Sequence, residues 1–241
     1  MMVFKNTNCI KKFQERITLA AEWIKNSKYL VVFTGAGIST ESGLPDYRGI
    51  WSSETNKDTL YKALSVNWKK VKPNDIHFAL VKLQELNILK FLISQNMDNL
   101  HLTSGIRDNL IAELHGNLTL ARCQQCGKKY AKTWDRPNKC FCGGHITSFI
   151  IKFGDDLPKE ELDLSLNHTK LADVFLMVGS SLMTQPAGSL PKIAKRNKAK
   201  LIFINRGETA LDRLADLRFN ENASRVLNEI IKKIVQKEEP Q

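Results

Sequence analysis

Segments with apolar residues at helical spacing alternate along the chain with short, continuously apolar runs. Apolar residues recur every three or four positions in three segments, which predicts amphipathic helices at residues 13–24, 76–86 and 226–234. Continuous apolar runs lie between and around them and predict buried strands at residues 30–33, 91–94, 174–178 and 201–204. Pro73 and Asn74 provide a start signal for the second helix. Together these patterns predict an α/β fold, with a Rossmann-like parallel sheet covered by helices on both faces.

Polar or glycine-containing segments follow each predicted strand. They are GAGIS after Phe33, QNMDNLH after Ser94, GSS after Val178 and NR after Ile204. In open parallel sheets, ligands bind beyond the carboxyl ends of the strands. The four segments therefore predict one binding site along a single edge of the sheet.

The segment GAGIST, Gly35 to Thr40, looks like part of a dinucleotide-binding turn. Glycines directly after a strand permit a tight turn and bring backbone N–H groups close to a phosphate. However, Thr40 takes the place of the third glycine of GxGxxG, and no second strand ends in an acidic residue about 20 residues later. On these residues alone, a nucleotide site and a plain tight turn both remain possible.

Four of the five cysteines lie in one segment that is poor in apolar residues. They form two close pairs, each followed by glycine: Cys123 and Cys126, and Cys140 and Cys142. Four thiolates on two tight turns suit tetrahedral zinc and leave no position open for water, which predicts a structural metal. The alternatives are unrelated free thiols, or a site in which His145 replaces Cys140.

This segment is expected to form an inserted zinc-binding module at residues 118–149, because it lacks the apolar residues for a core of its own. Residues 1–117 and 150–241 would then form the Rossmann-like domain, which carries the candidate nucleotide site.

The 36 lysines and arginines outnumber the 25 aspartates and glutamates, and the net charge of +11 is spread along the chain. Such an excess suits a nucleic acid or chromatin partner, and it equally suits a well-solvated surface. No apolar run is long enough to cross a bilayer, and the N-terminal residues lack the apolar region of a signal peptide. We expect an intracellular protein with no membrane partner, cytoplasmic in a prokaryote and nuclear or cytoplasmic in a eukaryote.

The order of the motifs points to a known family. GAGIST, ESGLPDYRG, SQNMDNLH, ELHGN, the four-cysteine segment, KFGDD, GSS and INR follow one another over residues 17–235. This set resembles the sirtuins, which are NAD-dependent protein lysine deacylases. The PAGSLP and ADLR stretches also resemble the compact branch that includes human sirtuin six. Three residues depart from the family pattern, with Tyr47 in place of Phe, Asn99 in place of Gly and Asp155 in place of Glu.

The resemblance implies NAD as co-substrate, an acylated lysine protein or peptide as substrate, and structural Zn²⁺. It assigns the chemistry to three residues. Asn96 would orient a water or ribose hydroxyl, and Asp98, with the backbone near Ile38, would hold the nicotinamide amide. His115 would be the general base for a ribose hydroxyl, a role that suits histidine because its unperturbed pKa is near 6.5.

The same resemblance assigns residues to the binding of the two substrates. Phe153 and Gly154 would pair edgewise with the substrate peptide. The NAD contacts would come from Gly35, Ala36, Gly37, Ile38, Ser39, Asp46, Tyr47, Arg48, Gln95, Gly179, Ser180, Ser181, Asn205 and Ala223.

Each of these segments also has a plainer explanation when taken alone. Residues 96–99 suit an Asx-rich turn, residues 180–181 suit a serine-rich turn, and a single histidine such as His115 is usually structural. His77 and His101 are expected to pack in helices or loops, and His168 to lie at the surface.

Two other functions remain open at this point. A mono-ADP-ribosyltransferase would use the same cation with another acceptor, and a silent chromatin or DNA-binding module would use only the zinc and the positive charge. The presence of Asn96, Asp98 and His115 together favours an enzyme.

Overall fold

The structure is a computed structural model that describes residues 3–45, 66, 70–133, 135–151 and 155–236, with side chains from residue 12 onward. Its strands are β1 (Leu30–Thr34), β2 (Leu89–Ser94), β3 (Ile111–Glu113), β4 (Gly116–Cys123), β5 (Lys129–Ala131), β6 (Ile146–Ile150), β7 (Val174–Val178), β8 (Lys200–Ile204) and β9 (Leu217–Phe219). Its α-helices are α1 (Val3–Lys25), α3 (Asp75–Glu85), α4 (Leu100–Ser104), α5 (Lys159–Leu171), α6 (Leu190–Arg196) and α7 (Ala223–Gln236). Short 3₁₀ helices are η1 (Ala36–Ile38), η2 (Thr40–Ser42), η3 (Asp108–Leu110), η4 (Ala187–Ser189) and η5 (Asp212–Leu214).

The main sheet has six strands in the order β3-β2-β1-β7-β8-β9, and all neighbours pair in parallel. The chain starts in the middle with β1, moves outward to β2 and β3, and returns to β7 on the other side of β1. A reversal of this kind leaves a crevice at the carboxyl ends of the two central strands. The predicted Rossmann-like parallel sheet is confirmed.

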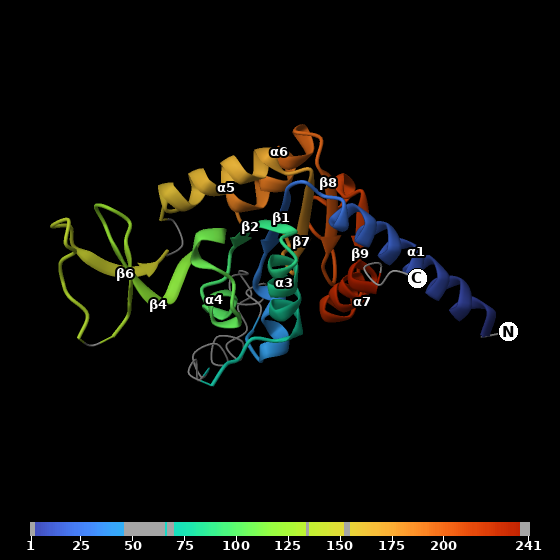
Figure 1. The fold of residues 1–241 in the computed structure, drawn as a ribbon, viewed down its shortest axis with the longest axis horizontal. Helices are drawn as coiled ribbons and strands as arrows, with labels where there is room; N and C mark the ends of the chain where they lie inside the picture. Colours follow the sequence, from blue (N-terminus) through green and yellow to red (C-terminus); the bar gives the residue numbers. More distant parts are fainter. Residues whose placement is uncertain (1–2, 46–65, 67–69, 134, 152–154, 237–241) are drawn as a thin grey trace.

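Helices cover both faces of this sheet, with α5 and α6 on one face and α1, α3 and α7 on the other (Figure 1). Alternate residues of β1 enter two separate cores, because successive side chains of a strand point to opposite faces. Val32 packs in the core of α1, α3 and α7, whereas Val31 and Phe33 pack in the core of α6 and the inner side of α5. Strand β1 is buried along its whole length, in agreement with its continuously apolar sequence.

The helix predicted after Pro73 begins as its sequence indicates. Asn74 is the N-cap of α3, and its side-chain oxygen accepts a hydrogen bond from the Ile76 N–H at 3.0 Å. His77 Nδ1 in turn accepts from the Asn74 N–H at 3.3 Å, so the two residues form a capping box.

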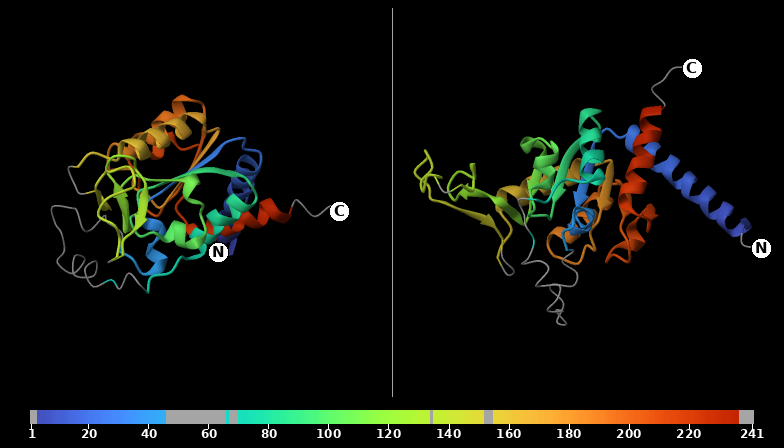
Figure 2. Two further views of the ribbon diagram at one scale, coloured as in Figure 1. Left: turned by 60° about the vertical axis from the view of Figure 1, so that its left-hand side comes forward. Right: turned by 90° about the horizontal axis from the view of Figure 1, so that it is seen from below.

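The cysteine module is a second, antiparallel sheet of three strands in the order β5-β4-β6. It projects from one end of the molecule, opposite the end where α1 begins (Figure 2). Its buried apolar cluster is small and consists of Ala121, Cys123, Cys140 and Ile146, with Tyr130 packed against them. Gly116 of β4 pairs with Ile150 of β6, so the sheet extends slightly beyond the predicted limits of residues 118–149. The division into domains stays a prediction.

Candidate functional site

Four segments that the sequence places after strands lie along the carboxyl edge of the main sheet. Backbone hydrogen bonds extend the strand pairing across this edge: Gln95 N to Thr34 O at 3.0 Å, Gly35 N to Val178 O at 3.1 Å, and Gly179 N to Ile204 O at 2.9 Å. Each segment therefore starts at the same level in the sheet. The edge over β1 and β7 is also the point where the strand order reverses.

The glycines of the GAGIS segment allow close packing of the turn on β7. A Cβ atom at Gly35 or at Gly37 would lie 2.8 Å from the carbonyl oxygen of Gly179. Gly179 has φ +66°, and a Cβ there would lie 2.6 Å from Ile38 N. The N–H groups of Gly35 and Gly37 donate to Val178 O and Gly179 O. Both N–H groups are used within the protein, so neither is free to donate to a phosphate.

Asn96, Ser39 and Asp98 form one hydrogen-bonded chain. Asn96 Nδ2 donates to Ser39 Oγ at 3.2 Å, and Ser39 Oγ donates to Asp98 Oδ2 at 2.6 Å. The other carboxylate oxygen, Asp98 Oδ1, accepts from the Leu100 N–H at 2.9 Å. The chain joins the η1 turn after β1 to the loop after β2, two segments that are far apart in the sequence.

One atom of the hydrogen-bonded group Asn96–Ser39–Asp98 is buried and unpaired. Asn96 is 4% exposed, and its Oδ1 has no hydrogen-bond partner within the described part of the protein. A buried acceptor without a donor is costly, and it indicates a site for a hydroxyl group or a water. Burial also raises the pKa of Asp98, and the hydrogen bonds from Ser39 and Leu100 oppose that rise.

His115 has one defined ring nitrogen. Its Nδ1 lies 2.9 Å from the carbonyl oxygen of Gln95, which can only accept, so Nδ1 carries the proton and Nε2 holds the free lone pair. Burial lowers the pKa of His115, and the hydrogen bond to Gln95 opposes this. The ring is therefore neutral near pH 7, with Nε2 available as a base.

Other predicted NAD-contact residues form hydrogen bonds either to a neighbouring segment or within their own turn. Ser180 Oγ donates to Gln95 Oε1 at 2.7 Å, which ties the segment after β7 to the one after β2. The Asn205 amide donates to the carbonyl oxygens of Arg206 and Gly207 within its own turn. Ser181 accepts a backbone hydrogen bond from Ala210, and Ala223 is the first residue of α7.

Five predicted residues lie outside the described part of the chain: Asp46, Tyr47, Arg48, Phe153 and Gly154.

Two residues that support this edge were not predicted as part of the site. Asn74 Nδ2 donates to Ile38 O at 2.8 Å, so the cap of α3 also holds the η1 turn. Glu41 in η2 accepts from Asn222 Nδ2 at 2.8 Å and from Ser224 Oγ, which ties η2 to the start of α7. In the sequence, Asn74 is visible only as a helix cap, and Glu41 only as the first residue of the motif ESGLPDYRG.

Two expected packing histidines lie directly behind the site. His101 Nε2 is 2.9 Å from Thr34 Oγ1, and its ring centroid lies 5.2 Å from that of His77. Both rings are buried, and burial lowers the pKa of each. His168 was expected at the surface, but it stacks on Phe91 with a centroid separation of 3.7 Å and is only partly exposed.

The four predicted cysteines form a compact group that could hold a metal ion. Their sulfur atoms lie within 4.8 Å of one another, and the pairs Cys123–Cys142 and Cys126–Cys140 are 3.5 Å apart. A tetrahedral Zn²⁺ with bonds of about 2.3 Å requires sulfur atoms roughly 3.8 Å apart. The donor set fits structural zinc, and His145 is not part of this group.

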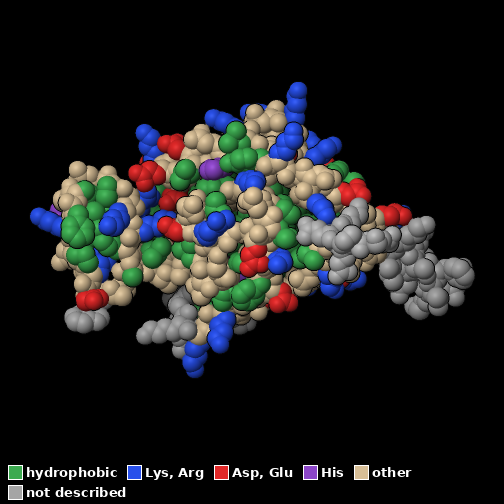
Figure 3. Space-filling view, in the orientation of Figure 1, with side chains coloured by type: hydrophobic (Ala, Val, Ile, Leu, Met, Phe, Trp, Pro, Cys, Tyr) green, Lys and Arg blue, Asp and Glu red, His purple; other side chains and the backbone are tan. Residues whose placement is uncertain are grey.

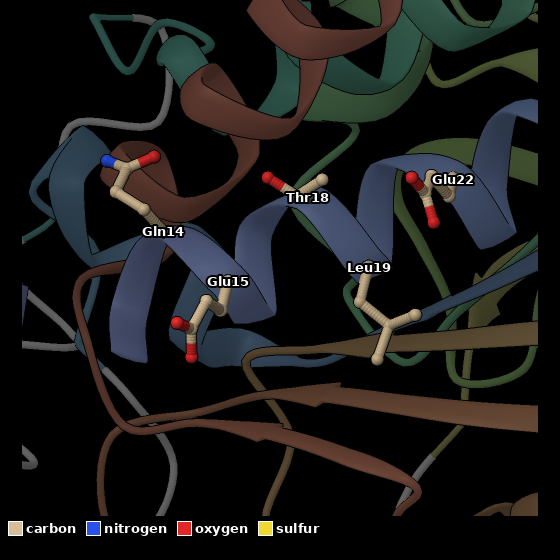
Figure 4. A pocket seen from close by; sticks show the side chains of 5 residues that line it. All are labelled: Gln14, Glu15, Thr18, Leu19 and Glu22. Carbon is tan, nitrogen blue, oxygen red and sulfur yellow. The ribbon is translucent and has the colours of Figure 1, made fainter. Parts of the chain in front are cut away.

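Two further features of the described residues concern possible binding or membrane crossing: a depression on α1 and the apolar character of the helices. A shallow, open depression lies along α1 and is lined by Gln14, Glu15, Thr18, Leu19 and Glu22 (Figure 4). All five come from a single helix away from the carboxyl edge. None of the described helices combines the length and the apolar character needed to cross a lipid bilayer.

Comparisons with known proteins identify the family of this chain. The Sir2 family model matches residues 53–186. An NAD-dependent protein deacetylase of Thermodesulfovibrio yellowstonii is 37% identical over 91% of this chain and 95% of its own. The solved structure "Sir2-p53 peptide-NAD+" superposes with a TM-score of 0.70 at 32% identity, over 88% of this chain and 95% of that one. "Structure of Sir2Tm bound to a propionylated peptide" gives 0.71 at 30% identity, over 90% and 98%. The chain belongs to the Sir2 family, the sirtuins.

Proposed function

We propose that this chain is an NAD-dependent protein lysine deacylase, which transfers the acyl group of a modified lysine to ADP-ribose and releases nicotinamide. The observation that carries the proposal is the Asn96–Ser39–Asp98 chain, with its unpaired Asn96 Oδ1, next to a neutral His115 at the carboxyl edge. The names of the similar proteins support the same activity, since they include an NAD-dependent protein deacetylase and structures with NAD⁺ and a propionylated peptide.

The side chains divide the reaction between early and late steps. NAD supplies the ribose carbon that receives the acyl oxygen. Asn96 Oδ1 would accept a hydrogen bond from a water or a ribose hydroxyl, which satisfies its buried oxygen. Asp98, fixed by Ser39 and Leu100, would hold the nicotinamide amide. His115 Nε2 would remove the proton from a ribose hydroxyl once the acyl oxygen has attacked.

Zinc has a structural part in this proposal. Four thiolates complete a tetrahedral shell, and no coordination position remains for a substrate or a water. The cysteines would therefore maintain the module, and the chemistry would take place at the edge of the main sheet.

Nucleic acid is not part of the proposed function. On the face shown in Figure 3, lysine and arginine side chains are scattered among acidic ones and form no single patch. We also propose an intracellular location, because the cysteines of the module form no disulfide, and disulfides are rare in reducing compartments.

The test combines a substrate panel with variants of His115, Asn96 and His168. The full chain is incubated with NAD and peptides carrying acetyl-, propionyl- or long-acyl-lysine, and the products are measured by mass. His115→Ala should reduce deacylated product by about 10²–10⁴-fold, the usual effect of losing a general base. Exchange of labelled nicotinamide into NAD should fall much less, because no ribose hydroxyl is deprotonated before that step. Asn96→Ala should reduce both rates.

His168→Ala is the matched control, since it removes a partly buried imidazole that packs on Phe91 and Tyr29. It should leave product formation near the parental rate. Parental product formation by His115→Ala, or an equal fall in both rates, would overturn the role of His115. An ADP-ribosylated peptide as the main product would favour the transferase instead.

A further inference from the structure

Buried polar side chains connect the loop that carries Asp98 with the cysteine module. Asn117 lies in the middle of this connection and is 0% exposed. Its Nδ2 donates to Asn99 Oδ1 at 2.8 Å and to Glu113 Oε1 at 2.6 Å. Its Oδ1 accepts from Thr119 N and Thr119 Oγ1, so the whole amide is occupied. A satisfied, buried amide of this kind fixes the geometry of both of its neighbours.

Asn99 forms the loop end of the connection. It directly follows Asp98 and adopts a left-handed conformation, with φ +66°, as the N-cap of α4. Besides accepting from Asn117, its side chain donates to Thr103 Oγ1 at 3.3 Å. A second hydrogen bond, from Leu118 N to Met97 O at 2.8 Å, ties the same loop to β4. Glycine would allow the backbone conformation but would remove the bond to Asn117.

Lys129 forms the module end, on strand β5. Its Nζ lies 3.5 Å from Glu113 Oε2, 3.8 Å from Glu161 Oε1 and 3.2 Å from Asp108 Oδ1. Glu113 is 2% exposed, and its Oε2 has Lys129 as its charged neighbour. A single cation from the module is therefore inserted between two buried carboxyl groups of the main domain. Removing it would leave Glu113 without a counter-charge, which is unfavourable in a buried site, whereas Glu161 would keep Arg122, whose Nη1 lies 3.9 Å from Glu161 Oε1.

We propose that Asn99, Asn117, Glu113 and Lys129 form a polar relay through which the cysteine module positions the Asp98 loop, with Asn99 as the positioning residue. Each link is a direct contact of 2.6–3.5 Å. Strand β3, which carries Glu113, leads directly to His115, so the relay also spans the segment of the base. The proposal extends the proposed function, because it gives the module a part in holding the nicotinamide end of the site.

Hydrogen exchange on the unliganded full chain tests the relay without any activity. The measured segment is residues 96–104, in the parent, Asn99→Gly, Lys129→Met and the double variant. Each single variant should speed exchange in this segment, although Lys129 lies on another sheet. If the relay links the two residues, each substitution should speed exchange less in the presence of the other than it does in the parent. The two accelerations should differ by a factor of at least ~2. Independent effects, which multiply, would overturn the proposal.

Two controls separate the relay from local loosening of the helix. Thr103→Val removes the other side-chain partner of Asn99 and should leave exchange at residues 96–98 near the parental rate. Asn99→Asp keeps the oxygen that accepts from Asn117 and should restore most of the protection. A Thr103→Val effect equal to that of Asn99→Gly would overturn the proposal. If Lys129→Met loses zinc or unfolds, Lys129→Gln replaces it in the same cycle.

The kinetic arm rests on the proposed function. Asn99→Gly should raise KM for NAD by about 3–10-fold, the loss expected for one neutral hydrogen bond, and leave KM for the acyl peptide unchanged. An equal rise in both KM values would contradict a specific role at the nicotinamide end. A parent without NAD-dependent product would refute the proposed function, and the exchange measurements would still decide the relay.

Discussion

The main sheet and the cysteine module are stabilised in different ways. The sheet separates two hydrophobic cores, and large side chains such as Phe33, Phe175 and Phe203 are fully buried in it. The buried cluster of the module contains four residues, and two of them are the proposed zinc ligands Cys123 and Cys140. Burial of apolar area therefore accounts for the sheet, whereas the module needs its metal. The difference shows how one chain stabilises a large domain and a small one.

The comparison also explains where the proposed chemistry lies. The segments around Asn96 and His115 continue directly from buried strands, so their positions are fixed by the sheet. The module contributes from the side, through the Lys129 contacts with Glu113 and Glu161. We therefore expect perturbation of the module to act on the site indirectly.

The largest expected effect is the loss of the metal. The parent should contain about one zinc per chain by elemental analysis, and Cys140→Ser or a chelator should remove it and unfold the module. Zinc binding contributes on the order of 10 kcal/mol in such sites. Limited proteolysis should then cut within residues 118–149, and the far-UV circular dichroism of the helices should persist. Cys9→Ser is the control and should retain zinc. Absence of zinc from parent purified without chelator would refute the prediction.

Shortening a core side chain of the sheet should have the next largest effect. Phe203→Ala leaves a cavity between the sheet and α6, and such changes cost about 3–5 kcal/mol. Urea unfolding followed by circular dichroism measures this loss. Ile146→Ala in the module should leave the main transition in place and weaken zinc retention instead. A similar shift of the main transition in both variants would show that the two regions unfold together.

Glu113, at the contact between the two regions, should make stability depend on pH. Burial raises the pKa of Glu113 from 4.5 to about 7, and Lys129 and Asn117 oppose that rise while Glu161 adds to it. Between pH 4.5 and about pH 7, Glu113 therefore binds more protons in the folded chain than in the unfolded chain. Stability therefore falls as pH rises from about 4.5 to 7, by about 3 kcal/mol in total for this group.

Glu113→Gln removes this titration. The free energy of unfolding of the variant should match the parent near pH 5 and exceed it near pH 8, as measured by urea unfolding at each pH. Glu160→Gln is the control, because Glu160 is an exposed acid that bonds Arg122. A difference between parent and Glu113→Gln that stays constant with pH would show that the carboxyl titrates normally.

The sequence predicts the buried parts of the fold well, because there the pattern and the environment agree. The run from Val174 to Val178 is continuously apolar and forms β7 with the same limits. Strand β2 begins at Leu89, two residues before the predicted start, because Lys90 interrupts the apolar run. The strands of the module were not predicted, because β5 has only three residues and neither β5 nor β6 is buried along its length.

The site was predictable where it depends on the sheet edge and unpredictable where it depends on docking between regions. Parallel strands bring Ser39 and Asp98 to one edge, and the structure joins them by a hydrogen bond. The contacts of Lys129 and Asn117 arise only when the module meets the main domain, and no local pattern indicates them. His168 was assigned to the surface because its partner Phe91 lies on a distant strand. The sirtuin-six-like branch stays a prediction.

The smallest expected effect concerns the support of the edge from α3. Asn74 has two separable functions, because its oxygen caps α3 at Ile76 N while its nitrogen donates to Ile38 O. Asn74→Ala removes both and should cost about 1 kcal/mol for the cap, which lowers Tm by roughly 2–4 °C in a chain of this size. Asn74→Asp keeps the cap oxygen and loses the donor to Ile38. Its Tm should therefore stay within a degree or two of the parent, whereas its affinity for NAD, measured by calorimetry, should fall as far as that of Asn74→Ala. If Asn74→Asp instead binds NAD like the parent, the η1 turn is held by its contacts with Gly179, Asn96 and Asp98, and the edge is rigid without help from the helix.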